Sequence, residues 1–186
     1  MLDYREARGF IKNGDILLYE GKGLISSIIM KVQKKFSKKR TVKGQYSHAG
    51  MVVWWNKRLM VLEAVGKGVF PTPLSRNIKH YKGRITIWRA SVSDSQRHKI
   101  IVFAQMEIGK EYHTLRLVLM FWKLIFGGAD KKDEFRAENK LVCSQYVAAA
   151  YNVGGCDLRR NLADRFTKPN DIADSPETRC CGTLKE

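Results

Sequence analysis

Cysteine is scarce in this chain, and the four cysteines present lack the spacing of a metal site. They are Cys143, Cys156, Cys180 and Cys181, and no two of them form a C-x-x-C pair. The sequence therefore predicts no structural zinc site, because such sites usually take ligands from paired cysteines. Adjacent Cys180 and Cys181 are poorly suited to bridging each other, so free thiols are expected in a reducing compartment. One of these thiols can then serve as a nucleophile.

Long apolar runs are also missing. Residues 1–10 are polar and mixed in charge, without the apolar region of a secretory signal. The longest apolar stretch, residues 115–126, contains Lys123 and is shorter than the ~20 residues that a membrane span needs. We therefore expect a cytoplasmic protein, with peripheral attachment to a membrane left open. The stretch itself fits either a buried helix over a sheet or an apolar face toward lipid or an acyl substrate.

Acidic residues are few: 18 Asp and Glu oppose 34 Lys and Arg, which leaves a net charge of +16. Such a charge favours an anionic partner, either a membrane surface or a polymer, although a solvated basic surface explains it equally well. Five basic residues end a predicted amphipathic helix: Lys34, Lys35, Lys38, Lys39 and Arg40. Nucleic acid is a weaker candidate, because no base-stacking aromatic residues alternate with these charges.

Hydrophobic patterns and turn signals divide the chain into a strand-rich first part and a helical second part. Strands are predicted at residues 16–19, 47–55, 58–65, 69–70 and 84–89, and the short turns between most of them indicate an antiparallel sheet. Helices are predicted at residues 24–36, from Asp94 or Ser95 to residue 108, and at 141–153. We expect one α+β domain over residues 1–186, with an antiparallel sheet packed against helices. A tail from about residue 158 is expected to have little regular structure.

Cys143 stands at the start of the last predicted helix. Backbone N–H groups and the helix dipole at such a position favour a thiolate. The N–H groups that follow, beginning with that of Ser144, can also receive a developing oxyanion. A lone helix cysteine is more often a buried structural residue, so the assignment depends on its companions.

Two further residues can complete a catalytic site with this cysteine. His48 begins a predicted strand beside the small residues Ala49 and Gly50, and a neutral imidazole there could take the thiol proton. Glu63 interrupts an apolar strand that is predicted to pair with the His48 strand, and a carboxylate there is costly unless it is paired. It could orient the imidazole, as the third member of a triad does, or face water from an edge strand.

Short segments at these positions and elsewhere carry a family resemblance. Their order is GDILL (14–18), the amphipathic helix, YSHAGM (46–51), VLEA (61–64), GKEY (109–112), VCSQ (142–145) and KPNDIA (168–173). This order resembles the YiiX-like branch of the NlpC-type papain-like cysteine peptidases, to which lecithin retinol acyltransferase-like enzymes are related. The resemblance covers about residues 13–175. Gln145 departs from it, because a glutamate is common there, and so does the long stretch 115–139.

The resemblance implies a circularly permuted papain-like (NlpC-type) fold in which the histidine strand precedes the cysteine helix. It also implies that Cys143 is the nucleophile, His48 the base and Glu63 the orienting residue, and that Tyr112 lines the site. The expected function is hydrolysis of an amide or ester, in a peptide, cell-wall or lipid-type substrate, through a thioester and without a cofactor. The alternatives are an acyltransferase with the same site and a non-catalytic basic module that binds nucleic acid or an anionic membrane.

Overall fold

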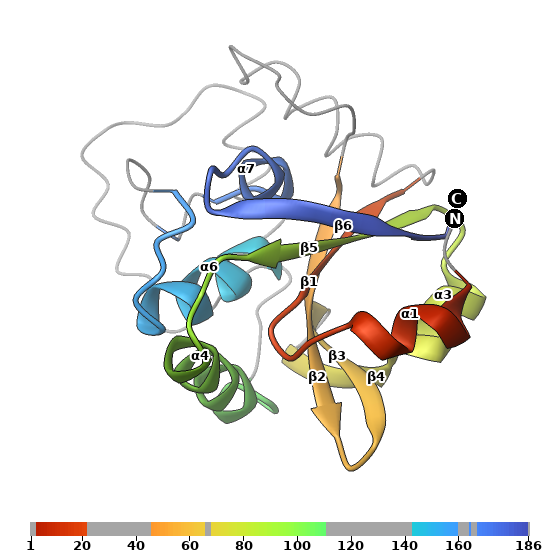
Figure 1. Ribbon diagram of the computed structural model, residues 1–186, viewed down its shortest axis with the longest axis horizontal. Coiled ribbons are helices and arrows are strands. Elements are labelled where there is room, and N and C mark those ends of the chain that lie inside the picture. The colour runs from red at the N-terminus through yellow and green to blue at the C-terminus, as the bar shows by residue number, and fades with distance from the viewer. Residues whose placement is uncertain are drawn as a thin grey trace.

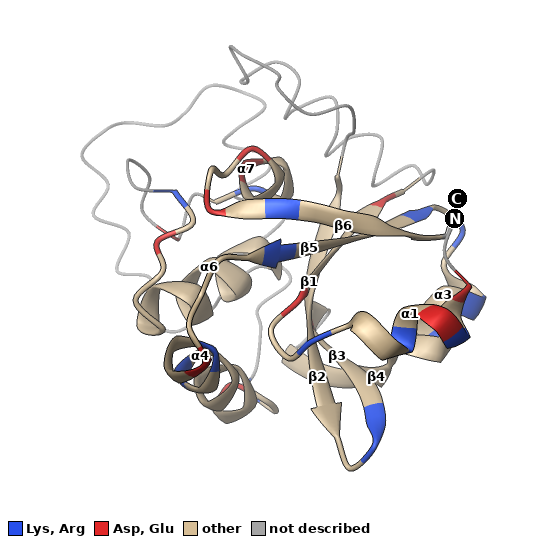
Figure 2. Ribbon diagram, in the orientation of Figure 1, with Lys and Arg blue, Asp and Glu red and all other residues tan. Residues whose placement is uncertain are grey.

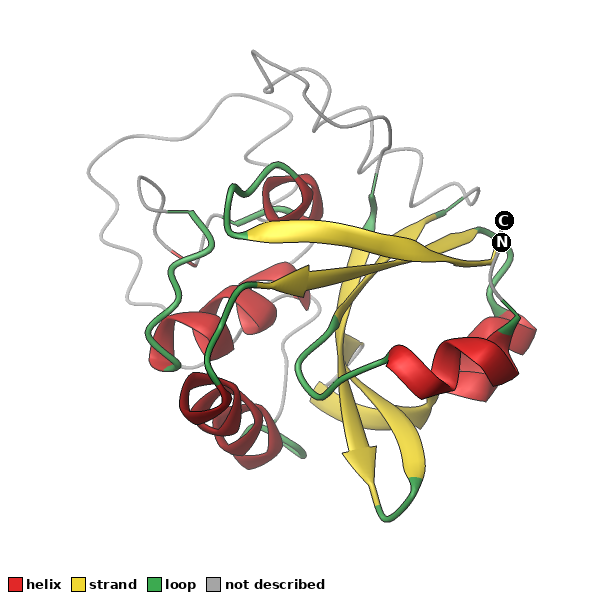
Figure 3. Ribbon diagram, in the orientation of Figure 1, coloured by secondary structure: helices red, strands yellow, loops and turns green. Residues whose placement is uncertain are grey.

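The computed structural model describes residues 3–21, 46–65, 68–110, 143–159, 164 and 167–185. Within these residues, six strands form one sheet in the order β4-β3-β2-β1-β5-β6, and all neighbouring strands are antiparallel (Figure 3). The strands are β1 (Ile16–Glu20), β2 (His48–Trp55), β3 (Arg58–Val65), β4 (Gly68–Pro73), β5 (Arg84–Ala90) and β6 (Thr178–Lys185). The antiparallel sheet and the α+β class predicted from the sequence are confirmed.

The β2–β3 hairpin forms at the predicted two-residue turn. Asn56 and Lys57 both have positive φ, 45° and 64°, as a type I′ turn requires, and this turn matches the twist of the two strands. The recorded pairs run from Trp55 opposite Arg58 to Met51 opposite Leu62. Beyond Met51, β2 stays paired with β1 as far as His48, and β3 stays paired with β4 as far as Val65. The pairing of β2 with β3 therefore ends before His48.

Helices cover both faces of the sheet (Figure 1). On one face lie α4 (Asp94–Met106) and α6 (Cys143–Val153), which contact each other, and α6 also contacts β2 and β3. On the other face lie α1 (Tyr4–Phe10) and α3 (Leu74–His80), which were not predicted from the sequence because both are short and bury few apolar residues. Alternate residues of β1, β2, β3 and β5 enter the two separate apolar clusters, as the period of two in a strand requires.

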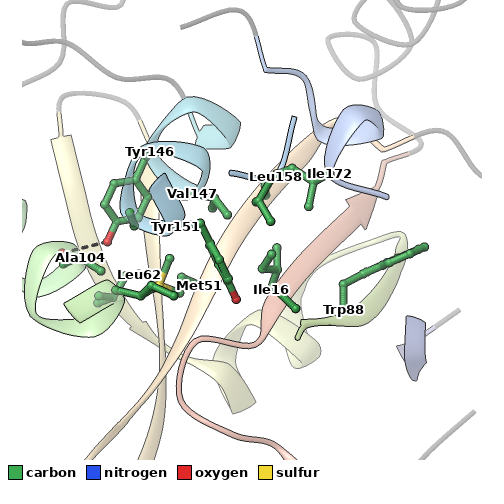
Figure 4. Packing of buried hydrophobic residues seen from close by; sticks show 14 of the residues in the cluster. Ile16, Met51, Leu62, Trp88, Ala104, Tyr146, Val147, Tyr151, Leu158 and Ile172 are labelled. Carbon is green, nitrogen blue, oxygen red and sulfur yellow. Dashed lines mark hydrogen bonds between the residues drawn. The ribbon is translucent and has the colours of Figure 1, made fainter. Parts of the chain in front are cut away.

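The core between α6 and the sheet contains two tyrosines whose hydroxyl groups have backbone partners (Figure 4). The Tyr146 hydroxyl donates to the Ala104 carbonyl oxygen at 2.9 Å, and the Tyr151 hydroxyl donates to the carbonyl oxygen of Gly14. Both tyrosines are fully buried, so their rings add packing area while their polar ends stay satisfied. These bonds fix α6 both to α4 and to the turn before β1.

The boundaries of α4 come from recognisable signals. Ser93 is the N-cap: its side chain accepts from the Gln96 N–H, and the Gln96 side chain accepts from the Ser93 N–H. The N-cap is therefore one residue before Asp94, the first of the two residues predicted for this position. The chain leaves the helix through Gly109, whose φ of +83° suits glycine.

A buried ion pair anchors the turn before β1. Asp15 is fully buried, and its two carboxylate oxygens each accept from Arg89, from Nε and from Nη2, at 2.7 Å. Arg89 also donates to the Phe10 carbonyl oxygen at 2.6 Å, and Asp15 accepts from the Lys12 N–H at 2.8 Å. The GDILL segment of the sequence therefore contains a structural carboxylate rather than a residue of the site.

The prediction of an unstructured tail from about residue 158 is wrong. The tail contains α7 (Pro169–Ala173) and the edge strand β6, which pairs with β5 through two register shifts. Pro169 stands in the first turn of α7, where proline is favoured. The β6 sequence lacks a regular alternation of apolar residues, so its strand conformation depends on pairing with β5.

Several predictions fall outside the described residues: the amphipathic helix with its five basic residues, Tyr112, and the stretch 115–139. In the described elements, lysine and arginine are spread over α1, α3, α4, β3, β5 and β6 (Figure 2). Among the described residues, no helix has the length and apolarity to cross a membrane.

Candidate active site

Cys143 is the first residue of α6, and its half-buried thiol lies at the helix N-terminus. Burial alone would raise the pKa of this thiol. The charge of His48, a hydrogen bond with it, and the backbone N–H groups of Ala49 and Ser144 outweigh burial and lower the pKa. The Ala49 N–H belongs to the part of β2 where no pairing with β3 is recorded. The parting of β2 and β3 thus leaves a backbone donor for the sulfur.

His48 lies between the thiol and a carboxylate. Its Nε2 is 3.0 Å from Glu63 Oε1, which leaves Nδ1 as the nitrogen for the hydrogen bond with Cys143. Burial alone would lower the pKa of His48, but the thiolate charge and the hydrogen bonds with Cys143 and Glu63 raise it to about 10. The opposite shifts of the two pKa values favour a thiolate–imidazolium pair around neutral pH.

Glu63 is buried inside the sheet, not exposed at an edge. Only 6% of the residue is exposed, and β3 has neighbours on both sides. Burial raises the pKa of this carboxyl group, whereas the hydrogen bond and charge of His48, with donors from Asn77 and Tyr19, lower it below its usual range. Gly50 allows this arrangement: a Cβ there would lie 3.0 Å from Glu63 Cγ and 2.7 Å from Val61 Cγ1. The glycine beside His48 therefore makes room for Glu63.

The carboxylate has two partners that sequence reasoning missed. Asn77, on α3, donates from Nδ2 to Glu63 Oε2 at 2.8 Å. The same nitrogen lies 3.0 Å from the Tyr19 hydroxyl oxygen, and the Tyr19 ring is 5.1 Å from the His48 ring. Asn77 lies in a stretch with no predicted element, and Tyr19 belonged to an apolar strand, so neither carried a signal of its own.

The segment that contains the KPNDIA motif connects α6 to the chain that leads into β2. The Ser144 hydroxyl donates to the Thr167 carbonyl oxygen at 2.6 Å, and the Tyr46 N–H donates to Asn170 Oδ1 at 2.8 Å. The Ser144 side chain is therefore engaged in this tie, and only its backbone N–H is directed to the sulfur. Of the five predicted site residues, the structure brings Cys143, His48, Glu63 and Ser144 together, while Tyr112 lies outside the described residues.

Comparison with known proteins gives two findings. A family model described as permuted papain-like amidase enzyme, YaeF/YiiX, C92 family, matches residues 11–121, a range that contains His48 and Glu63 and ends before Cys143. The crystal structure of metalloprotein yiiX from Escherichia coli O157:H7 has a TM-score of 0.66, with 21% identity over 94% of this chain and 98% of that chain. At this identity the likeness shows the fold alone. No curated protein sequence matches the chain.

The Escherichia coli protein is described as a metalloprotein. In the described part of this chain, no group of three or more His, Cys, Asp or Glu side chains could hold a metal ion. The one imidazole of the site already contacts Cys143 and Glu63, so these residues do not fit a metal. The family match agrees with the architecture. The sheet has helices on both faces, and the strand with His48 precedes the helix with Cys143, as in a permuted papain-like fold. The chain belongs to the permuted papain-like amidases of the YaeF/YiiX type.

Proposed function

We propose that this amidase-family chain uses Cys143 as the nucleophile, His48 as the general base and acid, and Glu63 as the residue that orients the imidazole. The observation that carries the proposal is the contact of His48 with both partners: its hydrogen bond with Cys143 and its 3.0 Å contact with Glu63 Oε1. A nucleophile, a base and an orienting acid in this arrangement form a triad, whatever their order in the chain.

The first half-reaction forms a thioester. The Cys143 thiolate attacks the carbonyl carbon of an amide or ester, and the carbonyl electron pair moves onto oxygen. Backbone N–H groups at the start of α6 can stabilise that negative charge, because they are fixed before the reaction. When the carbon–nitrogen or carbon–oxygen bond breaks, the His48 imidazolium gives its proton to the departing amine or alcohol. The acyl group remains on Cys143 sulfur, and His48 is neutral.

The second half-reaction releases the acyl group. Neutral His48 takes a proton from water, and the resulting hydroxide equivalent attacks the thioester carbon. The carbon–sulfur bond then breaks, so that the products are a carboxylic acid, a thiolate and an imidazolium, the starting state of the site. Glu63 stays ionised throughout and stabilises the imidazolium each time it forms. An amine or alcohol in place of water would give acyl transfer by the same steps.

Labelling with iodoacetamide at mildly acidic pH tests the site. We expect Cys143 to react first, because its thiol is the one with a neighbouring imidazolium and a helix N-terminus, whereas Cys156, Cys180 and Cys181 serve as internal controls. His48→Ala should remove this preference, and Cys143→Ser should abolish turnover of an amide or thioester reporter with the fold intact. Mass spectrometry of the peptides reports each site. Uniform labelling of all four thiols in the wild type would contradict the proposal.

A further inference from the structure

The far side of Glu63 is fully engaged by protein donors. One carboxylate oxygen, Oε1, faces His48, and the other, Oε2, accepts from Asn77 Nδ2 at 2.8 Å. The Asn77 amide nitrogen has a second hydrogen, which reaches the Tyr19 hydroxyl oxygen at 3.0 Å. Tyr19 in turn hydrogen-bonds Glu63. The carboxylate is therefore held from three directions, by β2, α3 and β1.

The chemistry of the amide requires this orientation. An ionised carboxylate accepts hydrogen bonds only, so the Asn77 oxygen would be repelled in the position that the nitrogen occupies. A charge-assisted bond of this kind is about twice as strong as a neutral one. The contact of the Tyr19 ring with the His48 ring, at 5.1 Å between centroids, limits the imidazole as well. Asn77 and Tyr19 thus constrain both the Glu63 carboxylate and the His48 imidazole.

We propose that Asn77 is a positioning residue, which holds the Glu63 carboxylate against His48 through an amide nitrogen shared between Glu63 and Tyr19. This inference rests on the proposed function. Asn77 bonds Glu63, and Tyr19 bonds Glu63 and packs on His48, so their effect on catalysis passes through Glu63 and His48.

The other titratable groups near His48 do not account for such an effect. Among the described residues, Cys143 faces it from α6, Tyr19 from β1 and Glu63 from β3, and Tyr81 packs behind Tyr19 at 5.0 Å. Burial raises the pKa of both tyrosines, so they stay neutral near neutral pH. With the thiol removed, Glu63 is the remaining charged neighbour, among the residues that the structure describes, whose position can change the pKa of His48.

The experiment measures the pKa of His48 by NMR in a Cys143→Ala background, where the thiolate is absent. The His48 signal is identified by its loss in His48→Ala. Asn77→Leu removes both amide donors and keeps the branching at Cγ, and it should lower the pKa of His48 by about 1 unit, since a loosened carboxylate stabilises the imidazolium less. Tyr19→Phe should lower it by less. Ser75→Ala, at an exposed position of α3, is the matched control and should leave the pKa unchanged.

Kinetics of the variants with an intact thiol supply a second readout. Asn77→Leu should reduce kcat with little change in KM and move the alkaline limb of the pH profile to lower pH. If the Asn77→Leu protein does not fold, Asn77→Ala takes its place, since alanine has a high helix propensity. An unchanged His48 pKa in a folded Asn77 variant overturns the positioning role. Failure of the wild type to label first at Cys143 overturns the proposed function instead, whatever Asn77 does.

Discussion

Two buried carboxylates, Asp15 and Glu63, are paired with cations in opposite ways. Asp15 is bound by two guanidinium nitrogens of Arg89, and this bond raises the pKa of the guanidinium further, so Arg89 keeps its charge in the physiological range. Glu63 meets a histidine, which has one contact to it and a second to a thiol. The comparison shows how one sheet uses a permanent ion pair to fix a turn and a titratable one to set the charge of the Cys143 thiol, the proposed nucleophile.

The largest expected effect is on the permanent pair. Arg89→Met leaves Asp15 buried and uncompensated, which should lower the free energy of unfolding by about 3–5 kcal/mol. Chemical denaturation measures this value. His48→Gln is the matched variant for the other pair, and it should cost much less stability, because the imidazole is partly exposed. Equal losses in the two variants would remove the distinction between the pairs.

A second prediction concerns activity. Glu63→Gln keeps the shape of the side chain but loses its charge, so kcat/KM should fall about 100-fold, within the range for general acid–base contributions. The alkaline limb should move to lower pH, because the imidazolium loses its counter-charge. A folded Arg89→Met protein assayed at low temperature should retain its kcat. A Glu63→Gln enzyme with wild-type activity would show that Glu63 has no orienting role.

The pH dependence of stability gives a third prediction. Folded His48 keeps its proton up to about 10, whereas in the unfolded chain it loses it above ~6.5. The Cys143 thiol has the opposite shift: its folded pKa is lowered, and the unfolded thiol keeps its proton to ~8.5. Between these two unfolded values, wherever the folded thiol is ionised, the proton counts of the two states cancel, so the site should add no slope to stability against pH.

Removal of the thiol should reveal the contribution of His48. In Cys143→Ala, the hydrogen bond and charge of Glu63 still act to raise the pKa of folded His48 against burial, which lowers it. Wherever the folded imidazole keeps a proton that the unfolded one has lost, above ~6.5, the folded state binds more protons than the unfolded state. Stability should then fall as pH rises from that value, in contrast to the wild-type plateau. Denaturant titrations at several pH values measure both curves. Curves of stability against pH with the same slope in the wild type and in Cys143→Ala would contradict the coupling of His48 and Cys143.

The smallest expected effect is at β6. Cys180 is exposed, and Cys181 is half-buried against the apolar cluster on the face of the sheet that α1 and α3 cover. Neither belongs to the candidate active site. Cys180→Ser with Cys181→Ser should retain full activity and change stability by about 1 kcal/mol or less. Loss of activity with retained stability would give these thiols a role in the reaction. Truncation after residue 174 is a poorer test, because it deletes a strand of the sheet.

Local signals in the sequence were sufficient for most of the sheet. The turn at Asn56 and Lys57, the apolar alternation around it, and the capping of α4 each depend on neighbouring residues, so one sequence reveals them. The tail was misjudged because β6 is a strand only by virtue of its pairing with β5. The short helices α1 and α3 were missed for a similar reason, since each is held to the sheet by a few buried contacts.

The sequence by itself determined the chemical types in the site: a cysteine at a helix start, a histidine at a strand start, and a carboxylate where an apolar residue would be expected. Only the tertiary structure decided which groups support them. Asn77 and Tyr19 reach Glu63 from elements far apart in the chain, and Gly50 is small because Glu63 passes over it. Hydrogen bonds and close packing act over a few ångströms in space, whatever the separation in sequence, so these partners become visible only when the chain is folded.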